Sequence, residues 1–235
     1  MGQSNPKPDE AAIPAPQAIH HEWRTAENSA AYLLPKIRTL KEQNPKLAIL
    51  DVGAGSGTIS ATLAALVPDG HVTALDKNEA ILPRARANAQ AAGVSNIDFQ
   101  QGDVNQLSLS DGSFDITHCH QMLCHLSDPA AALREMLRVT KPGGVVAARE
   151  GDLETECVWP ALPGLVKFHG FVAAVMTKSG GSATGGRQLL SWAIEAGAQR
   201  DQIKLSYGTW YYATPEDRRT WGKLSSFCAS TFISI

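Results

Sequence analysis

The sequence predicts an α/β fold, a doubly wound and mostly parallel sheet with helices on both faces. Apolar segments of strand length alternate with helical patterns between residues 47 and 150, at the spacing of βαβ units. A glycine-rich turn follows the first of these strands, and acidic residues stand at or just beyond the ends of the first three. In open sheets of this kind, ligands bind beyond the carboxyl ends of the strands, so these residues are the first candidates for function.

Composition and charge narrow the class of protein further. The chain has 235 residues, of which 43% are hydrophobic and 19% charged, and this suits one well-buried domain. A net charge of −2 without a basic block argues against nucleic acid as a partner. No apolar run approaches the roughly 20 residues that a membrane span needs, and the polar N-terminus does not resemble a signal peptide. Four cysteines without regular spacing argue against disulfides, so we expect a cytoplasmic protein.

The elements up to residue 150 follow one another in a regular order. Residues 1–18 are rich in proline and poor in large apolar side chains, which predicts a disordered tail before a domain at 19–235. Apolar residues at helical spacing predict a first helix over 20–37. Buried strands are expected at 47–52, 71–75, 97–101, 114–120 and 145–150. The helices between them are expected at 58–67, up to residue 92 after an irregular start at Pro83, and at 129–139 behind the cap Asp128.

The part after residue 150 has a looser pattern. Residues 153–178 indicate helices separated by prolines. The run "SGGSATGG", residues 179–186, is typical of a flexible link, with a substrate lid as the alternative. Residues 188–196 predict another helix, and "IKLSYGTWYYAT", residues 203–214, predicts a sixth strand.

The stretch "AILDVGAGSGTIS", residues 48–60, distinguishes between two kinds of ligand. Glycines at 53, 55 and 57 allow a sharp turn and a close approach to a ligand without Cβ clashes. A dinucleotide site has the spacing G-x-G-x-x-G, but here the third glycine comes one residue early. Asp51 would repel a pyrophosphate, whereas it suits the amino group and sulfonium of S-adenosylmethionine. A turn without a ligand and a nicotinamide-dependent oxidoreductase are the alternatives.

Two more acids support S-adenosylmethionine. Asp76 ends the second strand, where it is placed to accept hydrogen bonds from both ribose hydroxyls of either cofactor. Asp103 follows the third strand, where it is placed to accept from the adenine amino group while Val104 packs on the ring. Each acid alone is more commonly a capping or turn residue. Acids after three successive strands together favour a cofactor site.

These motifs as a set resemble a known family. "LDVGAGSG", "ALD", "GDV" and "FDITHCHQMLCHLSDPAAALREMLRVTKPGG" are similar to those of class I S-adenosylmethionine-dependent methyltransferases, which have a Rossmann-like fold. The branch they resemble most is that of the ubiquinone and menaquinone biosynthesis methyltransferases. "HHEWRTAENSAAYLLP" further resembles members that act on small molecules, including some in secondary metabolism. The resemblance covers residues 20–222.

The resemblance implies a cofactor half at 19–150, which binds S-adenosylmethionine, and acceptor-side segments at 151–235. The methionine part would lie along the glycine turn with its amino group at Asp51, and the cover of the site would come from the N-terminal helix. The cofactor-binding residues that it implies are Arg24, Thr25, Asp51, Gly53, Ala54, Gly55, Asp76, Lys77, Asp103, Val104, His120 and Gln121.

The run "HCHQMLCH", residues 118–125, suggests a metal site at first sight. On a strand, however, His118 and His120 face one way and Cys119 the other, and no C-x-x-C pair is present. We therefore expect no metal. His120 stands where the methyl group would lie, so it is our candidate for a catalytic base.

The acceptor side is less defined by the sequence. Many aromatic residues follow the fifth strand, which suits a small apolar or aromatic acceptor; a cofactor-binding protein without transferase activity is the alternative. The stretch "FCASTFISI", residues 227–235, does not resemble the family's continuation into a last, antiparallel strand. We therefore expect that strand to be missing, with lower stability, self-association through an incomplete sheet and impaired activity.

Overall fold

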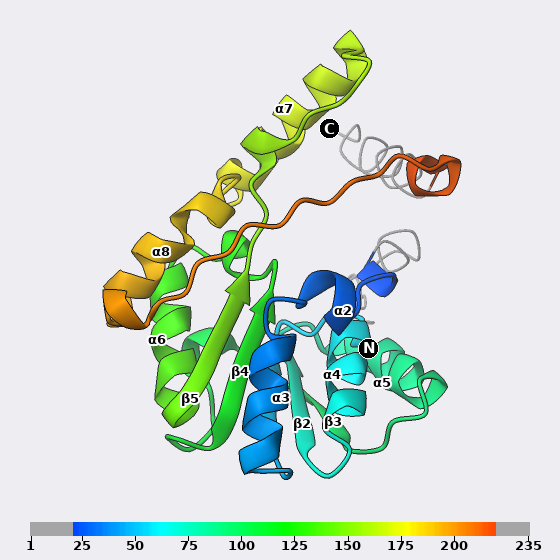
Figure 1. Cartoon of the computed structure of the whole chain (residues 1–235). Coiled ribbons are helices and arrows are strands. Elements are labelled where there is room, and N and C mark those ends of the chain that lie inside the picture. Colours follow the sequence, from blue (N-terminus) through cyan, green and yellow to red (C-terminus); the bar gives the residue numbers. More distant parts are fainter. Residues whose placement is uncertain (1–20, 220–235) are drawn as a thin grey trace, which may run out of the picture.

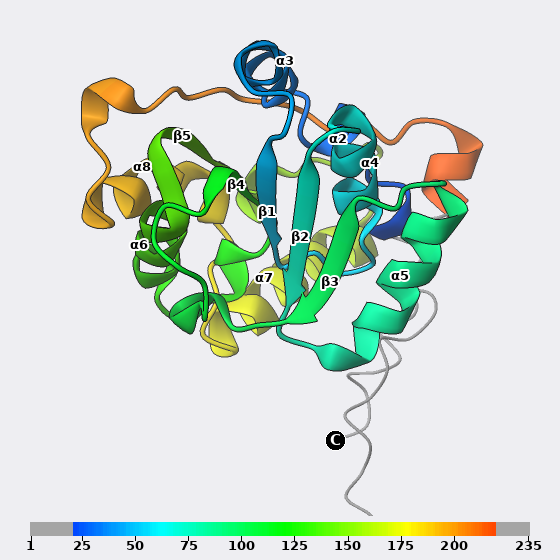
Figure 2. The same cartoon turned by 90° about the horizontal axis from the view of Figure 1, so that it is seen from below.

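The computed structural model describes residues 21–219, and within them five parallel strands form one sheet in the order β3-β2-β1-β4-β5 (Figure 2). The strands are β1 (Ala48–Val52), β2 (His71–Asp76), β3 (Ile97–Gln101), β4 (Phe114–His120) and β5 (Thr140–Arg149). The order reverses next to β1, which pairs with β2 on one side and with β4 on the other. The α/β, doubly wound and Rossmann-like fold class is confirmed. The tail predicted at 1–18 lies outside the described residues.

Helices cover both faces of this sheet (Figure 1). The longer ones are α3 (Leu34–Gln43), α4 (Thr58–Leu66), α5 (Leu82–Ala91), α6 (Pro129–Val139), α7 (Pro163–Lys178) and α8 (Gly185–Glu195). The short ones are α2 (Ala26–Ser29) and the 3-10 turns η1 (Glu79–Ile81), η2 (Val104–Gln106), η3 (Leu123–His125), η4 (Leu153–Thr155) and η5 (Arg200–Gln202). The irregular start predicted at Pro83 is the turn η1, and it leaves the proline in the first turn of α5, where no amide donor is required.

The side chains of β1 point alternately to the two faces of the sheet, and their contacts show which helices cover each face. Leu50 and Val52 are buried in a cluster with residues of α6 and α8. Ile49 is buried in a second hydrophobic cluster, with residues of α3 and α4. Asp51 therefore lies on the same face as Ile49, beneath α4, because successive side chains of a strand point to opposite faces.

The N-terminal segment differs from the prediction of one helix over 20–37. The structure has α2 and α3 as separate helices. Thr25 ends the segment before them in an extended conformation and caps α2, because its hydroxyl accepts a hydrogen bond from the Asn28 amide. Pro35 lies in the first turn of α3, where proline favours a helix start. Cap and proline together break the single helix that apolar spacing predicts.

Strand β5 begins earlier than predicted. The residues "KPGG" lie inside it, and the pairing with β4 shifts register between Phe114 and Ile116. Gly143 within this run has φ +80°, a conformation that favours glycine. The run is thus a bulge in the strand rather than a turn before it.

The strand predicted at 203–214 is wrong. The segment pairs with no strand among the described residues, and it crosses the end of β5 towards the N-terminal helices (Figure 1). Two of its aromatic side chains, Trp210 and Tyr212, pack there against Trp23, with the Trp210 and Trp23 ring centroids 5.4 Å apart. Residues 215–219 are helical. The predicted loss of a last strand and the resulting self-association concern residues 220–235, which lie outside the described part, and stay predictions.

The glycine run 179–186 is held in place by backbone hydrogen bonds. The Ser182 amide donates to the Cys124 carbonyl oxygen at 2.8 Å, and the Leu153 amide donates to that of Ala183 at the same distance. By contrast, none of the residues of α7 is buried, and this helix extends away from the sheet (Figure 1). Across residues 21–219, every helix is too short or too polar to pass through a bilayer.

Candidate functional site

The turn between β1 and α4 is built on glycines in left-handed backbone conformations. Gly53 and Gly57 have φ of +71° and +75°. A Cβ on Gly53 would lie 2.5 Å from Met122, and one on Gly57 would lie 2.8 Å from Ala85 and Phe99. Nothing lies within 4 Å of the Cβ position of Gly55. The turn is therefore packed tightly on the protein side and open on the other, as a cradle for a ligand must be.

A pocket lies over this turn, at the carboxyl ends of β1 and β4. Seven of the twelve predicted cofactor-binding residues line it: Arg24, Asp51, Gly53, Ala54, Gly55, His120 and Gln121. The lining residues that sequence reasoning missed are His21, Ser56, Thr58, Ile59 and Ile81. Thr58 and Ile59 lie on the first turn of α4, directly after the glycines, so the motif itself could have indicated them.

Asp51 is held by two side chains beneath the pocket. It is only 3% exposed; Ser60 Oγ donates to its Oδ2 at 2.5 Å, and His118 Nδ1 lies 2.7 Å from its Oδ1. Asp51 and His118 are register partners on β1 and β4. Each carboxylate oxygen has a second lone pair, so Asp51 can still accept from a ligand amino group. Sequence reasoning left His118 without a role, and the structure makes it the support of Asp51.

Asp76 connects the end of β2 to the glycine turn. Its Oδ2 accepts from the Gly55 amide at 2.8 Å and its Oδ1 from the Asn78 amide at 2.9 Å. Asp76 does not line the pocket itself but lies one hydrogen bond away from it. One lone pair on each oxygen stays available, which suits the two hydroxyls of a ribose.

The residues predicted at the adenine and beside the ribose lie outside this pocket. Lys77 and Asp103 form an ion pair with 2.9 Å between Nζ and Oδ2. The hydrogen bond from Lys77, and then the Asn105 amide, lower the pKa of Asp103. Val104 is buried in the core at 6% exposure. The Thr25 side chain caps α2, where its hydroxyl accepts the hydrogen bond from the Asn28 amide instead of facing the pocket.

The N-terminal segment is fixed above the pocket at two places. Glu22 accepts from Arg84 of α5 at 2.6 and 2.9 Å, and the Ala26 amide donates to Thr62 of α4 at 2.7 Å. These bonds place Arg24 in the pocket wall, where it is 6% exposed. Its Nε has no hydrogen-bond partner, and no acid forms an ion pair with it within the described residues. Burial is the main cause that lowers its pKa to about 10, so the guanidinium stays charged at neutral pH.

His120 is 7% exposed, and neither of its ring nitrogens has a partner among residues 21–219. Burial first, and then the charge of Arg24, lower its pKa to about 2, so the imidazole is neutral. Base strength follows pKa, which makes this ring a weak base. The next residue, Gln121, has φ +49° and is the one non-glycine residue in the described part of the chain with a positive φ. Such strain is common where a structure holds a ligand.

Three aromatic rings lie around His120 and Arg24. Trp210 has its ring centroid 5.7 Å from that of His120, and Trp23 and Tyr212 contact Trp210 edge to face. Of the other late aromatics, Trp192 is in the core, whereas Trp159 and Tyr211 are exposed. The Trp210 indole nitrogen is buried without a partner inside the described range.

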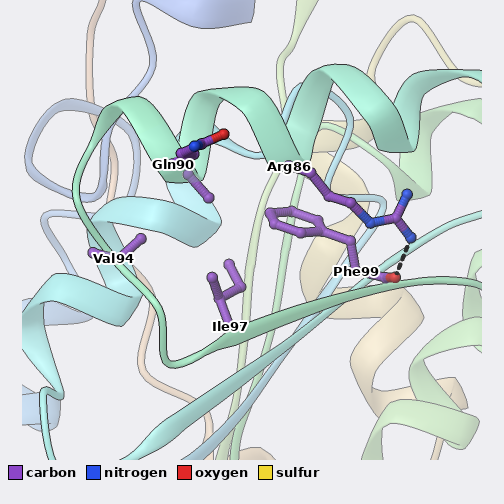
Figure 3. A pocket seen from close by; sticks show the side chains of 6 residues that line it. Arg86, Gln90, Val94, Ile97 and Phe99 are labelled. Atoms are coloured by element: carbon purple, nitrogen blue, oxygen red, sulfur yellow. Dashed lines mark hydrogen bonds between the residues drawn. The ribbon is translucent and has the colours of Figure 1, made fainter.

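A second pocket lies at the other edge of the sheet, between α5 and β3 (Figure 3). Its lining is mostly apolar, and its one cation, Arg86, donates to the Phe99 carbonyl oxygen at 2.9 Å. None of the predicted site residues lines it. In the described part of the chain, no three His, Cys, Asp or Glu side chains gather as metal ligands. The pocket over the glycine turn is therefore the candidate active site.

Comparison with known proteins agrees with this geometry. The model of the methyltransferase domain family matches residues 43–182. An uncharacterized methyltransferase of Schizosaccharomyces pombe is 35% identical over 208 residues, which are 85% of this chain and 71% of that protein. The ubiquinone/menaquinone biosynthesis C-methyltransferase of Bdellovibrio bacteriovorus is 31% identical over 180 residues, 77% of this chain and 70% of that protein.

Among solved structures, one from Bacillus halodurans, provisionally described as a methyltransferase, has a TM-score of 0.54 and 27% sequence identity. The similarity covers 70% of this chain and 68% of that one. Family match, relatives and fold agree with the motifs of the glycine turn. The chain belongs to the methyltransferase domain family, with the Rossmann-like fold of S-adenosylmethionine-dependent methyltransferases.

Proposed function

We propose that this pocket binds S-adenosylmethionine and that the chain transfers its methyl group to a small apolar or aromatic acceptor. The observation that carries the proposal is Arg24, a buried cation that forms no ion pair in the described chain, beside a glycine cradle and a buried carboxylate. A methionine part carries a carboxylate and an ammonium, so it complements Arg24 and Asp51 at once. When bound, the cofactor supplies a methyl group on a positively charged sulfur.

In this reaction, the residues of the chain bind the cofactor and orient the acceptor. Gly53 and Gly55 let the backbone approach the methionine part, and Asp76 receives the ribose hydroxyls. Asp103, which is paired with Lys77 further along the same edge, would accept from the adenine amino group. Holding the acceptor in line with the methyl group provides most of the acceleration of a displacement at carbon. His120 and Gln121 form the wall at the methyl group.

The ribose assignment is tested by Asp76→Ala. We expect the variant to bind S-adenosylmethionine more weakly by about 1–3 kcal/mol, because charge-assisted hydrogen bonds are lost. Isothermal titration calorimetry measures it, with Asp98→Ala, an exposed acid of β3, as control. NAD titrated into the parent protein checks the nicotinamide alternative. An Asp76→Ala affinity equal to that of the control would remove Asp76 from the site.

The methyl-side assignment is tested by His120→Ala. We expect turnover to fall much more than cofactor affinity, because His120 is proposed to contact the acceptor. Turnover on a panel of phenols, quinols and thiols, measured as S-adenosylhomocysteine formed, is compared with the calorimetric affinity. Turnover within a few-fold of the parent would make His120 a lining residue. Cofactor binding without turnover on any acceptor would favour the binding protein without transferase activity.

A further inference from the structure

Two arginines lie against the ring of Trp210. The guanidinium carbon of Arg149 is 4.5 Å from the ring centroid, and that of Arg24 is 5.3 Å from it. Each contact is a favourable cation–π interaction, but the two cations repel each other. Within the described residues neither arginine forms an ion pair, and Arg149 reaches only the carbonyl oxygens of Asn28 and Ser29, at 3.4 and 3.3 Å. Arg149 therefore has no acidic ion-pair partner in the described chain, whereas the charge of the buried Glu150 acts on Arg24.

The cluster adjoins the methyl-side wall of the pocket. Arg149 and His120 are register partners on β5 and β4, so their side chains lie on the same face of the sheet. The Gln121 amide, next along the chain, donates to the Arg149 carbonyl oxygen at 2.8 Å. In the sheet order, β5 lies on the far side of β4 from the glycine turn. Arg149 is thus placed on the side where an acceptor, rather than the cofactor, would approach.

The acids nearby leave Arg149 without a partner. Asp51 is the carboxylate proposed to hold the cofactor's ammonium, in addition to its bonds with Ser60 and His118. Glu150 accepts at its Oε1 from the amides of Met122 and Leu123 at 3.0 and 2.8 Å, and burial raises its pKa. Its Oε2 has no hydrogen-bond partner in the described chain, and its charge acts on Arg24. The cofactor's carboxylate would pair with Arg24 and its ammonium with Asp51, which leaves its sulfonium and the guanidinium of Arg149 as the cations beside the acceptor. An anion is the missing component.

On the basis of the proposed function, we infer that the acceptor is a small planar organic acid, methylated on an ionised oxygen and recognised by Arg149 and Trp210. The unpartnered nitrogens of the site fit this ligand. The Trp210 indole N–H is a donor, and one His120 nitrogen can donate to the oxyanion. The guanidinium of Arg149 suits a carboxylate or phenolate, and the exposed face of a planar acid can stack on aromatic rings.

The charge also explains how the reaction proceeds without a strong base. The guanidinium of Arg149 and the sulfonium of the cofactor would lower the pKa of the acceptor, whose proton passes to water when it ionises. The oxyanion then attacks the methyl carbon, and the new O–C bond forms as the C–S bond breaks. The electron pair of the C–S bond stays on sulfur, which becomes a neutral thioether. The products are a methyl ether or ester and S-adenosylhomocysteine.

The test compares the parent protein with Arg149→Gln and with Arg86→Gln, an arginine at the other edge of the sheet. With S-adenosylhomocysteine bound, benzoate and benzamide are titrated as an acid and its neutral counterpart. We expect the parent and Arg86→Gln to prefer benzoate by about 10-fold, and Arg149→Gln to lose this preference. Turnover of 4-nitrophenol at pH 8, where it is ionised, should likewise exceed that of unionised phenol only when Arg149 is present.

Each outcome decides a separate point. Equal binding of benzoate and benzamide by the parent, or an undiminished preference in Arg149→Gln, overturns the inference. If Arg149→Gln melts early, Arg149→Lys replaces it, and this variant should keep part of the preference because it keeps the charge. The affinity for S-adenosylhomocysteine should be the same in all variants. Failure of the parent to bind it would overturn the proposed function, whereas benzoate selectivity in the free protein would still support the anion site.

Discussion

Replacing His118 by alanine is expected to lower the free energy of unfolding by about 3–5 kcal/mol, the effect of removing one partner from a buried ionic or charge-assisted pair. His118 is fully buried, and it holds a carboxylate that is itself 3% exposed. Without the imidazole, Asp51 would retain only Ser60 as a side-chain partner, although its carboxylate is buried. Urea unfolding followed by circular dichroism measures the change.

The chain offers a matched control for this experiment. His71 and Asp98 form a second His–Asp pair, with 2.9 Å between nitrogen and oxygen, but both side chains are about half exposed or more. His71→Ala should therefore change the stability by no more than about 1 kcal/mol. If His118→Ala and His71→Ala lower the free energy of unfolding by the same amount, burial does not determine the strength of the Asp51–His118 pair.

Replacing Arg24 by methionine is expected to weaken S-adenosylmethionine binding by roughly 10- to 100-fold, the value of a hydrogen-bonded charge contact in a dry site. Methionine keeps much of the length and apolar surface of arginine, so packing against Trp210 is largely retained. Calorimetry on the parent, Arg24→Met and Arg86→Met measures it, with the last as a surface control.

The ligand provides a second comparison for Arg24. Decarboxylated S-adenosylmethionine lacks the group that we assign to the guanidinium, so the parent should bind it more weakly than S-adenosylmethionine. Arg24→Met should bind the two ligands about equally. If Arg24→Met still discriminates between the two ligands as strongly as the parent, the carboxylate of the cofactor lies elsewhere and Arg24 contacts another charged group.

The fold and the centre of the site were predictable because their signals are local. A strand, three spaced glycines and a helix follow one another within residues 48–66, so one short segment determines the turn and its open side. Asp76 was predictable for the same reason, since it ends a strand next to β1. Position along a strand is enough to place such residues at the ligand edge.

What was not predictable depends on pairing between distant segments. The bond between Asp51 and His118 requires the register of β1 against β4, which neither strand encodes alone. Residues 203–214 have the composition of a strand, but strand preference depends on the neighbours available, and Trp210 packs on Trp23 and two arginines instead. The arrangement that points to an anionic acceptor therefore appears only in three dimensions.

The exposure of α7 has a consequence for how this chain can diversify. A helix that buries none of its sixteen residues contributes little to the free energy of folding, so the sheet does not depend on its sequence. We therefore expect substitutions and changes of length within α7 itself to be tolerated without disturbing the cofactor turn. On the basis of the proposed function, we expect the glycine turn to stay fixed among related chains, whereas this outer helix is free to adapt to new acceptors.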